Sequence, residues 1–249
     1  MSGHSKWATI KHKKAAVDKA RAKNFAKLIR QLEVAARSGG SDLNSNATLR
    51  TMYDKARAAS VPTDTIDRAI KRGAGELEGV SYEAVTYEGY ASEGVAVLVD
   101  ALTDNRNRTS ADIRHLFSKN GGAMAEPGAV AWQFERKGVV LVARSADEDE
   151  LTLVAADAGA EDVVDEGEHW RVTCEPTDLN PVREAIEAAG MGPVEADLTK
   201  LAKATVSLDA VDAAKRVLRL VDALDEHDDV QDVWVNFDIP DKVLEAVGD

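Results

Sequence analysis

The chain changes its hydrophobic spacing near residue 80, and this change constrains the fold more than any other feature. Up to Gly75, apolar residues recur at three- and four-residue steps, which is the spacing of amphipathic helices. From Tyr82 onward, short apolar runs typical of strands alternate with helical segments. The length of 249 residues allows two or three domains. The sequence therefore predicts an α+β protein with a helical N-terminal part.

Three short helices are predicted before the change. The first covers about 18–38 and ends at Gly39-Gly40, the second runs from about 49 to 60, and the third covers about 63–73. Val61-Pro62 ends the second helix, because a residue before proline is disfavoured in the helical region. Short loops between amphipathic helices predict a small helical bundle.

The rest of the chain predicts two α/β domains. Strands are expected over 82–91, 94–103 and 129–134, with a helix beginning at Thr109 or Ser110. The order βαββαβ over 137–199 is a ferredoxin-like pattern. The last strand–helix–strand has no partner of its own, so we expect it to pair with the strands before residue 135. The predicted domains are therefore a basic helical domain (1–78), a discontinuous α/β domain (79–135 plus 200–249) and an inserted ferredoxin-like domain (136–199).

Charge is divided unequally along the chain. Residues 1–75 contain 16 Lys and Arg against 6 Asp and Glu, a net charge of +10, whereas residues 76–249 contain 15 against 38, a net charge of −23. Such a division can orient a molecule on a polyanion, with its basic part attracted and its acidic part repelled. The pattern indicates a nucleic-acid partner.

The cations of the first helix gather on one face. Lys19, Lys23, Lys27, Arg30 and Arg37 fall within roughly a quarter of the helix circumference, and most apolar residues lie opposite. Val34 is an apolar exception on the wrong face. These five cations, the cationic stripe, could simply be solvated, but ordinary solvated faces mix both signs of charge. We expect the stripe to contact phosphates, which requires that the protein's own acids do not neutralise it.

The first residues add further cations and an aromatic ring. Trp7 could stack on a base, although anchoring the N-terminal arm to the helices is the favoured role. The predicted nucleic-acid-binding residues are Lys6, Trp7, Lys11, His12, Lys13, Lys14, Lys19, Lys23, Lys27, Arg30 and Arg37.

A second candidate site precedes the helix predicted near residue 110. Arg106 and Arg108 lie just before its N-terminus, which carries a partial positive charge. Either the arginines turn toward acids such as Asp100 or Asp104, or they bind an anion such as phosphate together with Thr109 and the free amides. The sequence leaves both alternatives open.

Nothing in the sequence favours catalysis. The five histidines are scattered, Cys174 is the single cysteine, and no phosphate loop, nucleophile elbow or zinc motif is present. The acidic runs 147–150 and 225–229 are interpreted as solvated caps and loops. No apolar run approaches the ~20 residues needed to span a bilayer. We expect a cytoplasmic protein, not an enzyme, with no cofactor, metal, membrane or small-molecule substrate.

Several motifs resemble one family. Gly3-His-Ser-Lys-Trp7, Ile10-Lys-His-Lys-Lys14, Tyr87-Glu-Gly-Tyr90 and Leu102-Thr-Asp-Asn105 are similar to motifs of the YebC/PmpR family, which includes a mitochondrial translational activator of cytochrome c oxidase subunit one. The resemblance implies three domains, the third inserted into the second. It also implies a cytoplasmic, probable DNA-binding transcriptional regulator, although some relatives are described as ribosome-associated translation factors.

Two hypotheses follow from these observations. In the first, the chain binds duplex DNA and regulates transcription, as the family label implies. In the second, it binds RNA or the ribosome and assists translation. No helix presents an obvious set of Asn, Gln and Arg for reading base edges, which favours the second hypothesis on physical grounds.

Overall fold

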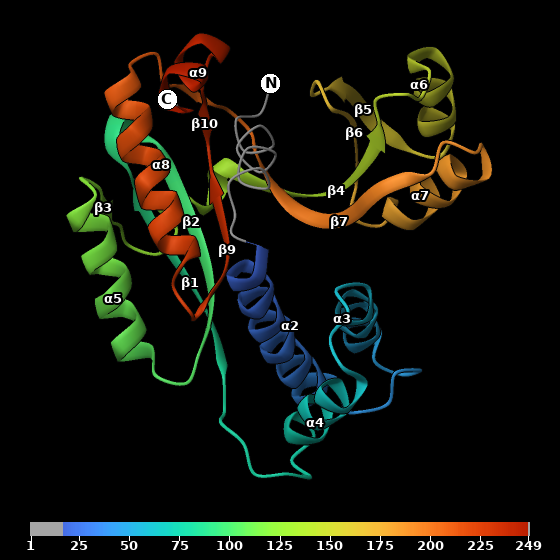
Figure 1. The fold of residues 1–249 in the computed structure, drawn as a ribbon, viewed down its shortest axis with the longest axis vertical. Helices are drawn as coiled ribbons and strands as arrows, with labels where there is room; N and C mark the ends of the chain where they lie inside the picture. Colours follow the sequence, from blue (N-terminus) through green and yellow to red (C-terminus); the bar gives the residue numbers. More distant parts are fainter. Residues whose placement is uncertain (1–16, 249) are drawn as a thin grey trace.

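The computed structural model describes residues 17–248 and shows a mixed α/β protein with a helical part and two four-stranded sheets (Figure 1). The predicted fold class is confirmed. The change in hydrophobic spacing near residue 80 coincides with the link between the last helix of the helical part and the first strand.

The helical part contains α2 (Val17–Gly39), α3 (Ala47–Ala58) and α4 (Thr63–Gly73), so all three predicted helices are present. Apolar faces of these helices form one core, and its buried members include Leu32, Leu49 and Ile66. Asn46 caps α3 by accepting a hydrogen bond from the Leu49 amide, and its side-chain nitrogen donates to the Ala35 carbonyl of α2 at 2.8 Å. One side chain thus starts one helix and fixes it to another.

The first sheet has the order β3-β1-β2-β9, and its neighbouring strands are antiparallel. The strands are β1 (Glu83–Tyr90), β2 (Ala96–Thr103), β3 (Ala123–Met124) and β9 (Val230–Val235). Helices α5 (Arg106–Lys119) and α8 (Val211–Asp225) cover one face, and α2 lies toward the other (Figure 1). The pairing of β9 with β2 confirms that the end of the chain returns to the strands before residue 135.

Short elements complete this part of the protein. A 3-10 turn, η1 (Ser92–Gly94), joins β1 to β2, and β8 (Val206–Ser207) pairs in parallel with β10 (Phe237–Asp238). The chain then forms α9 (Asp241–Gly248), which the sequence analysis did not predict. Partly buried apolar side chains of α9 pack against the core of the first sheet.

The second sheet belongs to the segment between β3 and β8. Its elements are β4 (Phe134–Ala143), α6 (Glu148–Asp157), β5 (Ala160–Asp165), β6 (His169–Cys174), α7 (Leu179–Ala188) and β7 (Pro193–Ala202). The antiparallel order β5-β6-β4-β7 is the one expected of a ferredoxin-like βαββαβ unit. The long strands β4 and β7 lead from this unit toward the first sheet (Figure 1). We propose that the helical part and the two sheets correspond to the three domains predicted above.

The strand predicted over 129–134 is wrong. Most of that segment is a loop with a 3-10 turn, η2 (Ala131–Gln133), because its amides have another partner. The buried Glu88 carboxylate accepts hydrogen bonds from the backbone amides of Gly128, Val130 and Ala131 at 2.6–2.8 Å. Burial raises the pKa of Glu88, but these three bonds outweigh it, so the pKa lies below its ordinary value.

Candidate nucleic-acid interface

The predicted nucleic-acid-binding residues divide into two groups. Lys6, Trp7, Lys11, His12, Lys13 and Lys14 lie outside the described residues, and for Lys19 the structure describes only its place in α2. The remaining four cations, Lys23, Lys27, Arg30 and Arg37, belong to the described part of α2. The structure therefore describes the surroundings of the cationic stripe, whereas nucleic-acid binding by the N-terminal arm stays a prediction.

The middle of the stripe packs against the turn that joins α8 to β9. We call this turn, residues 225–229, the acidic turn. The Lys27 ammonium donates to the Asp225 carboxylate at 3.2 Å and to the Gln231 carbonyl at 3.0 Å. The Lys23 ammonium donates to the Asp225 carbonyl oxygen. Lys23 and Lys27 of the cationic stripe thus hold the helical part against the first sheet.

Arginines of α2 continue this contact. The Arg30 guanidinium donates to the Asp229 carboxylate at 3.0 Å and to the Asp228 carbonyl, and it lies 5.3 Å from the centre of the Tyr82 ring. Arg37 is exposed and donates to the Ser81 hydroxyl at 2.7 Å. The expectation that the stripe is free of the protein's own acids is therefore wrong for Lys27 and Arg30. Their role toward nucleic acid remains a prediction.

Asp229 is the centre of this contact. Its side chain is only 5 % exposed, and its second carboxylate oxygen accepts hydrogen bonds from Arg108 at 2.8 Å and from the Thr109 hydroxyl at 2.7 Å. The Thr109 hydroxyl also lies 2.7 Å from that of Thr103. The carboxylate therefore joins α2, α5 and the start of β9. The interpretation of 225–229 as a solvated loop is wrong for this residue.

The second candidate site contains this same carboxylate. Helix α5 starts at Arg106 with Asn105 as its N-cap, so Arg106 and Arg108 lie in the first turn rather than before it. The Asn105 amide oxygen is as good a cap as the predicted Thr109 or Ser110. Arg108 binds Asp104 at 2.8 Å as well as Asp229, and both Arg106 and Arg108 are exposed. For Arg108 the acid-paired alternative is therefore correct. Anion binding by Arg106, Arg108 and Thr109 stays a prediction, and the Asp229 carboxylate occupies the side of Arg108 and Thr109 that faces the turn.

Electrostatics at Asp229 favour the ionised form. Burial raises the pKa of this carboxyl, but hydrogen bonds from Thr109 and Arg108 and the charges of Arg108 and Arg30 outweigh burial, so the pKa lies below its ordinary value. Hydrogen bonds to Asp229 and Asp104 raise the pKa of Arg108. Asp229 is therefore negatively charged and Arg108 positively charged at neutral pH.

A pocket of about 510 Å³ opens beside this contact. Its lining includes two arginines, Arg30 and Arg108, together with five acids. The acids are Asp104, Asp112, Glu226, Asp228 and Asp229. A surface with this excess of carboxylates repels phosphate, so the pocket itself does not add a phosphate site.

Other cations of the helical part remain on the surface. Arg68 and Lys71 of α4 are exposed, and Arg50 of α3 is exposed while donating to the Asn44 side chain at 2.9 Å. Among the described residues, no group of three or more His, Cys, Asp and Glu is arranged to hold a metal ion. Within the same residues, no helix is both long and apolar enough to cross a membrane.

Comparison with known proteins identifies the family. The model of the TACO1/YebC N-terminal domain matches residues 5–76, and the model of the TACO1/YebC second and third domain matches residues 82–237. The chain belongs to the TACO1/YebC family. The resemblance found in the sequence motifs is confirmed.

Relatives in this family match over nearly the whole chain. A protein of Frankia casuarinae named probable transcriptional regulatory protein is 53 % identical and is covered completely by this chain. A protein of the same name from Acidithiobacillus ferrooxidans is 53 % identical over 98 % of this chain and 97 % of its own. The crystal structure of a conserved hypothetical protein from Aquifex aeolicus is 46 % identical, with a TM-score of 0.84 over 96 % of this chain and 98 % of its own.

The contact between α2 and the acidic turn joins the two TACO1/YebC units. Lys27 and Arg30 lie within the N-terminal match, and their partners Asp225 and Asp229 lie within the second. These partners were not predicted from the sequence, because they lie about 200 positions away from the stripe. A signal was available, since the densest acidic run after residue 200 complements the densest cationic helix in charge.

Proposed function

We propose that this TACO1/YebC protein is a non-enzymatic, DNA-binding transcriptional regulator that contacts DNA phosphates through its basic N-terminal region. The observation that carries the proposal is the division of charge, with a net +10 in residues 1–75 and −23 in the rest. The name probable transcriptional regulatory protein, which relatives at about 50 % identity carry, supports the choice of DNA. The proposed contacts are the N-terminal arm and the stripe on α2.

The cationic stripe can bind DNA phosphates only if Lys27 and Arg30 release the carboxylates that they hold. Lys27 and Arg30 hold carboxylates in the docked arrangement, so phosphate must compete with Asp225 and Asp229 for them. Exposed ion pairs contribute little to stability, whereas breaking a buried pair is costly because it leaves an uncompensated charge. Lys27 and Arg30 retain 15 % and 19 % exposure, so the exchange requires α2 to move away from the acidic turn. In this proposal the N-terminal arm binds first and the stripe follows.

Salt dependence of binding tests the proposal. Each phosphate neutralised on duplex DNA contributes about 0.9 to the slope of log affinity against log salt. The variant Lys19→Gln/Lys23→Gln/Lys27→Gln should bind a 30-base-pair duplex more weakly, with a slope reduced by up to about three such contributions. A matched variant, Arg114→Gln/Lys119→Gln/Lys203→Gln, removes three exposed cations outside the stripe. Equal affinity and slope for the two variants would contradict the role of the stripe.

An RNA or ribosome partner is the second candidate, and one observation favours it. The cationic face of α2 is turned toward the acidic turn, so in this arrangement α2 does not present that face to a major groove. Ribosome co-sedimentation of the full chain and of the variant Lys6→Gln/Lys11→Gln/Lys13→Gln/Lys14→Gln tests this candidate. Co-sedimentation that is lost in the variant, together with weak binding to duplex DNA, would favour translation over transcription.

A further inference from the structure

Residues 74–82 join the helical part to the first sheet, between the end of α4 at Gly73 and the start of β1 at Glu83. Residues 74–81 are all exposed. We call residues 77–82 the strap. Among the described residues, none of the strap makes a backbone–backbone hydrogen bond, whereas Gly75 and Glu76 still bond to the end of α4. The strap therefore depends on side chains for its position.

Two arginines of α2 contact the strap. The Arg37 guanidinium donates from Nη1 to the Ser81 hydroxyl at 2.7 Å and from Nη2 to the Val80 carbonyl at 3.3 Å. The Arg30 guanidinium lies 5.3 Å from the centre of the Tyr82 ring, within the range of a cation–π contact. Both arginines belong to the cationic stripe, so the stripe holds the strap as well as the acidic turn.

A third arginine packs against the middle of the strap. The aliphatic stem of Arg72 from α4 lies so close to Gly79 that a Cβ atom added there would be 3.0 Å from Arg72 Cδ. The stem is itself held in place, because Arg72 Nε donates to the buried Glu33 carboxylate at 2.7 Å. The strap is therefore fastened to the helical part at Gly79, Val80 and Ser81.

The two arginines of α2 differ in their partners. Arg30 also binds the Asp229 carboxylate at 3.0 Å, so it holds the strap and the acidic turn together. Among the described residues, Arg37 has no carboxylate partner, and its hydrogen bonds go to the neutral oxygens of Ser81 and Val80. Hydrogen bonds between an arginine and a phosphate are stronger than those to a neutral oxygen. Phosphate can therefore displace the strap from Arg37.

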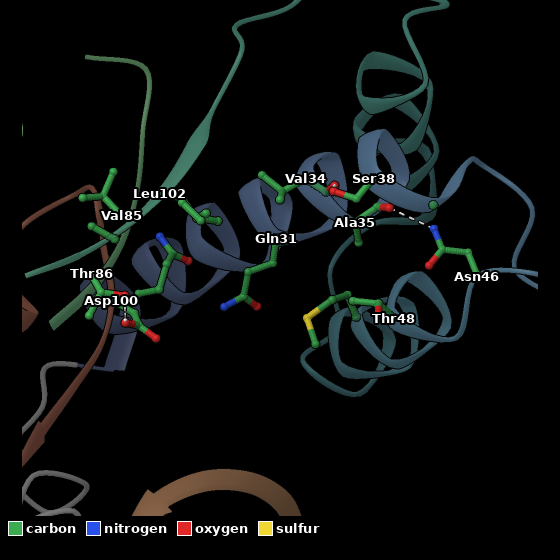
Figure 2. A pocket seen from close by; sticks show the side chains of 15 residues that line it. Gln31, Val34, Ala35, Ser38, Asn46, Thr48, Val85, Thr86, Asp100 and Leu102 are labelled. Carbon is green, nitrogen blue, oxygen red and sulfur yellow. Dashed lines mark hydrogen bonds between the residues drawn. The ribbon is translucent and has the colours of Figure 1, made fainter. Parts of the chain in front are cut away.

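A pocket separates the C-terminal half of α2 from the first sheet. Its volume is about 530 Å³, and its walls come from α2 and α3 on one side and from β1 and β2 on the other (Figure 2). Figure 2 shows Val34 and Ser38 on α2, with Val85 and Leu102 on the sheet. Val34 is the apolar exception in the helical pattern, and it lines this pocket instead of the bundle core. A boundary that encloses such a space buries less apolar area, so it costs less to open.

We propose that the strap is a hinge that Arg37 and Arg30 hold closed, and that phosphates binding to these arginines release it. While held, the strap keeps the helical part near the sheet, which raises the effective concentration of the cationic stripe at the acidic turn. Once released, the strap can extend to about 20 Å, and the helical part moves away from the sheet. Release by DNA rests on the function proposed above, whereas the hold of the arginines on the strap does not.

A protease that cleaves after glutamate tests the hold on the strap, because Glu78 is exposed within it. Cleavage of a transiently opened segment follows the population of its open form. In the full chain at low salt, Arg37→Gln should be cleaved after Glu78 about three- to tenfold faster than wild type, the range for loss of one hydrogen bond. Arg68→Gln, which removes an exposed arginine of α4, is the matched control and should be cleaved at the wild-type rate.

Ser81→Ala tests the same contact from the side of the strap and leaves every charge in place. It should be cleaved faster than wild type but more slowly than Arg37→Gln, because the Val80 carbonyl still accepts from Arg37. Equal rates for wild type, Arg37→Gln and Ser81→Ala would overturn the hold of Arg37 on the strap.

Spin labels measure the movement itself. Labels at Arg68→Cys on α4 and Arg114→Cys on α5 span the boundary between the helical part and the first sheet, and the native Cys174 is buried. Inorganic polyphosphate should add a population with a longer label-to-label distance, and Arg37→Gln should increase that population without polyphosphate. Distances that do not change when polyphosphate binds would overturn the hinge. A response to polyphosphate but not to a 30-base-pair duplex would support the hinge and contradict the function proposed above.

Discussion

The first sheet meets its two neighbours in different ways. Its contact with the helical part is polar and consists of cations of α2 bound to carboxylates and carbonyls of the acidic turn. Its contact with the ferredoxin-like unit includes a buried apolar cluster with Leu98, Phe134 and Trp234, beside which Lys200 of β7 pairs with Asp100 of β2 at 2.7 Å. The chain also crosses this second boundary twice, through β4 and β7.

This difference predicts which boundary opens. Ion pairs can be exchanged for phosphate or salt at modest cost, whereas a buried apolar contact cannot be exchanged for water without losing its burial free energy. The helical part is therefore the unit that can move, and the ferredoxin-like unit is held in place. Lys55 of α3 and Asp197 of β7, 2.5 Å apart, form a further polar link that must also open.

The largest effect is expected at the apolar boundary. Trp234→Ala removes a side chain that is 9 % exposed and packs against Phe134 and Leu98, so it should lower the free energy of unfolding by about 3–5 kcal/mol. Urea unfolding followed by circular dichroism measures this loss. A loss below 1 kcal/mol would mean that the apolar boundary does not hold the two sheets together.

A smaller effect is expected at the centre of the polar contact. Asp229→Asn keeps the shape of the side chain but leaves Arg30 without its carboxylate partner and Arg108 with Asp104 alone, which should cost about 1–3 kcal/mol. Asp104→Asn is the matched control, because it removes an exposed acid that also binds Arg108. Equal unfolding free energies for the two variants would show that Asp229 contributes no more to stability than the exposed Asp104 does.

Low pH should destabilise the protein partly through protonation of the Asp229 carboxylate. The pKa of Asp229 is lower in the folded protein than its unfolded value of ~3.9, so its contribution to stability is fully present above that pH. The contribution is lost as pH falls through the folded pKa. The stability difference between wild type and Asp229→Asn should therefore shrink below about pH 4. Urea titrations between pH 2 and pH 6 measure it, and a difference that grows on acidification would contradict the assigned direction.

The smallest effect on stability is expected at a single ion pair of the stripe. Lys27→Met should change the unfolding free energy by no more than about 1 kcal/mol, because the pair retains contact with solvent. It should nevertheless speed hydrogen exchange at the start of β9 in low salt, and Lys71→Met on α4 should not. Unchanged exchange near Gln231 in the Lys27 variant would show that the pair does not control opening.

Much of the fold could be predicted from local patterns. Helices α2, α3 and α4 follow from apolar spacing and from Gly and Pro stops, and the ferredoxin-like order follows from alternating segments. The segment 129–134 could not be predicted, because Glu88, about 40 positions earlier, captures its amides. The start of α5 was misplaced because several residues near it are suitable caps.

The candidate site was less predictable than the fold. Periodicity correctly gathered the cations of α2 on one face, but it does not reveal what lies opposite that face. The partners Asp225 and Asp229 come from the other end of the chain, and only the return of β9 to β2 brings them to α2. Likewise, Val34 was visible as an exception in the helix, while the pocket that it lines required the sheet to be in place.

In the proposed function, the acidic turn and nucleic-acid phosphates compete for the cationic face of α2. The most direct test compares duplex-DNA affinity at low salt for wild type, Asp225→Asn and Asp212→Asn, which removes one exposed acid of α8 from outside the contact. We expect Asp225→Asn to bind DNA several-fold more tightly than Asp212→Asn does, because Lys27 loses its carboxylate partner. Equal affinities for the two variants would contradict the competition.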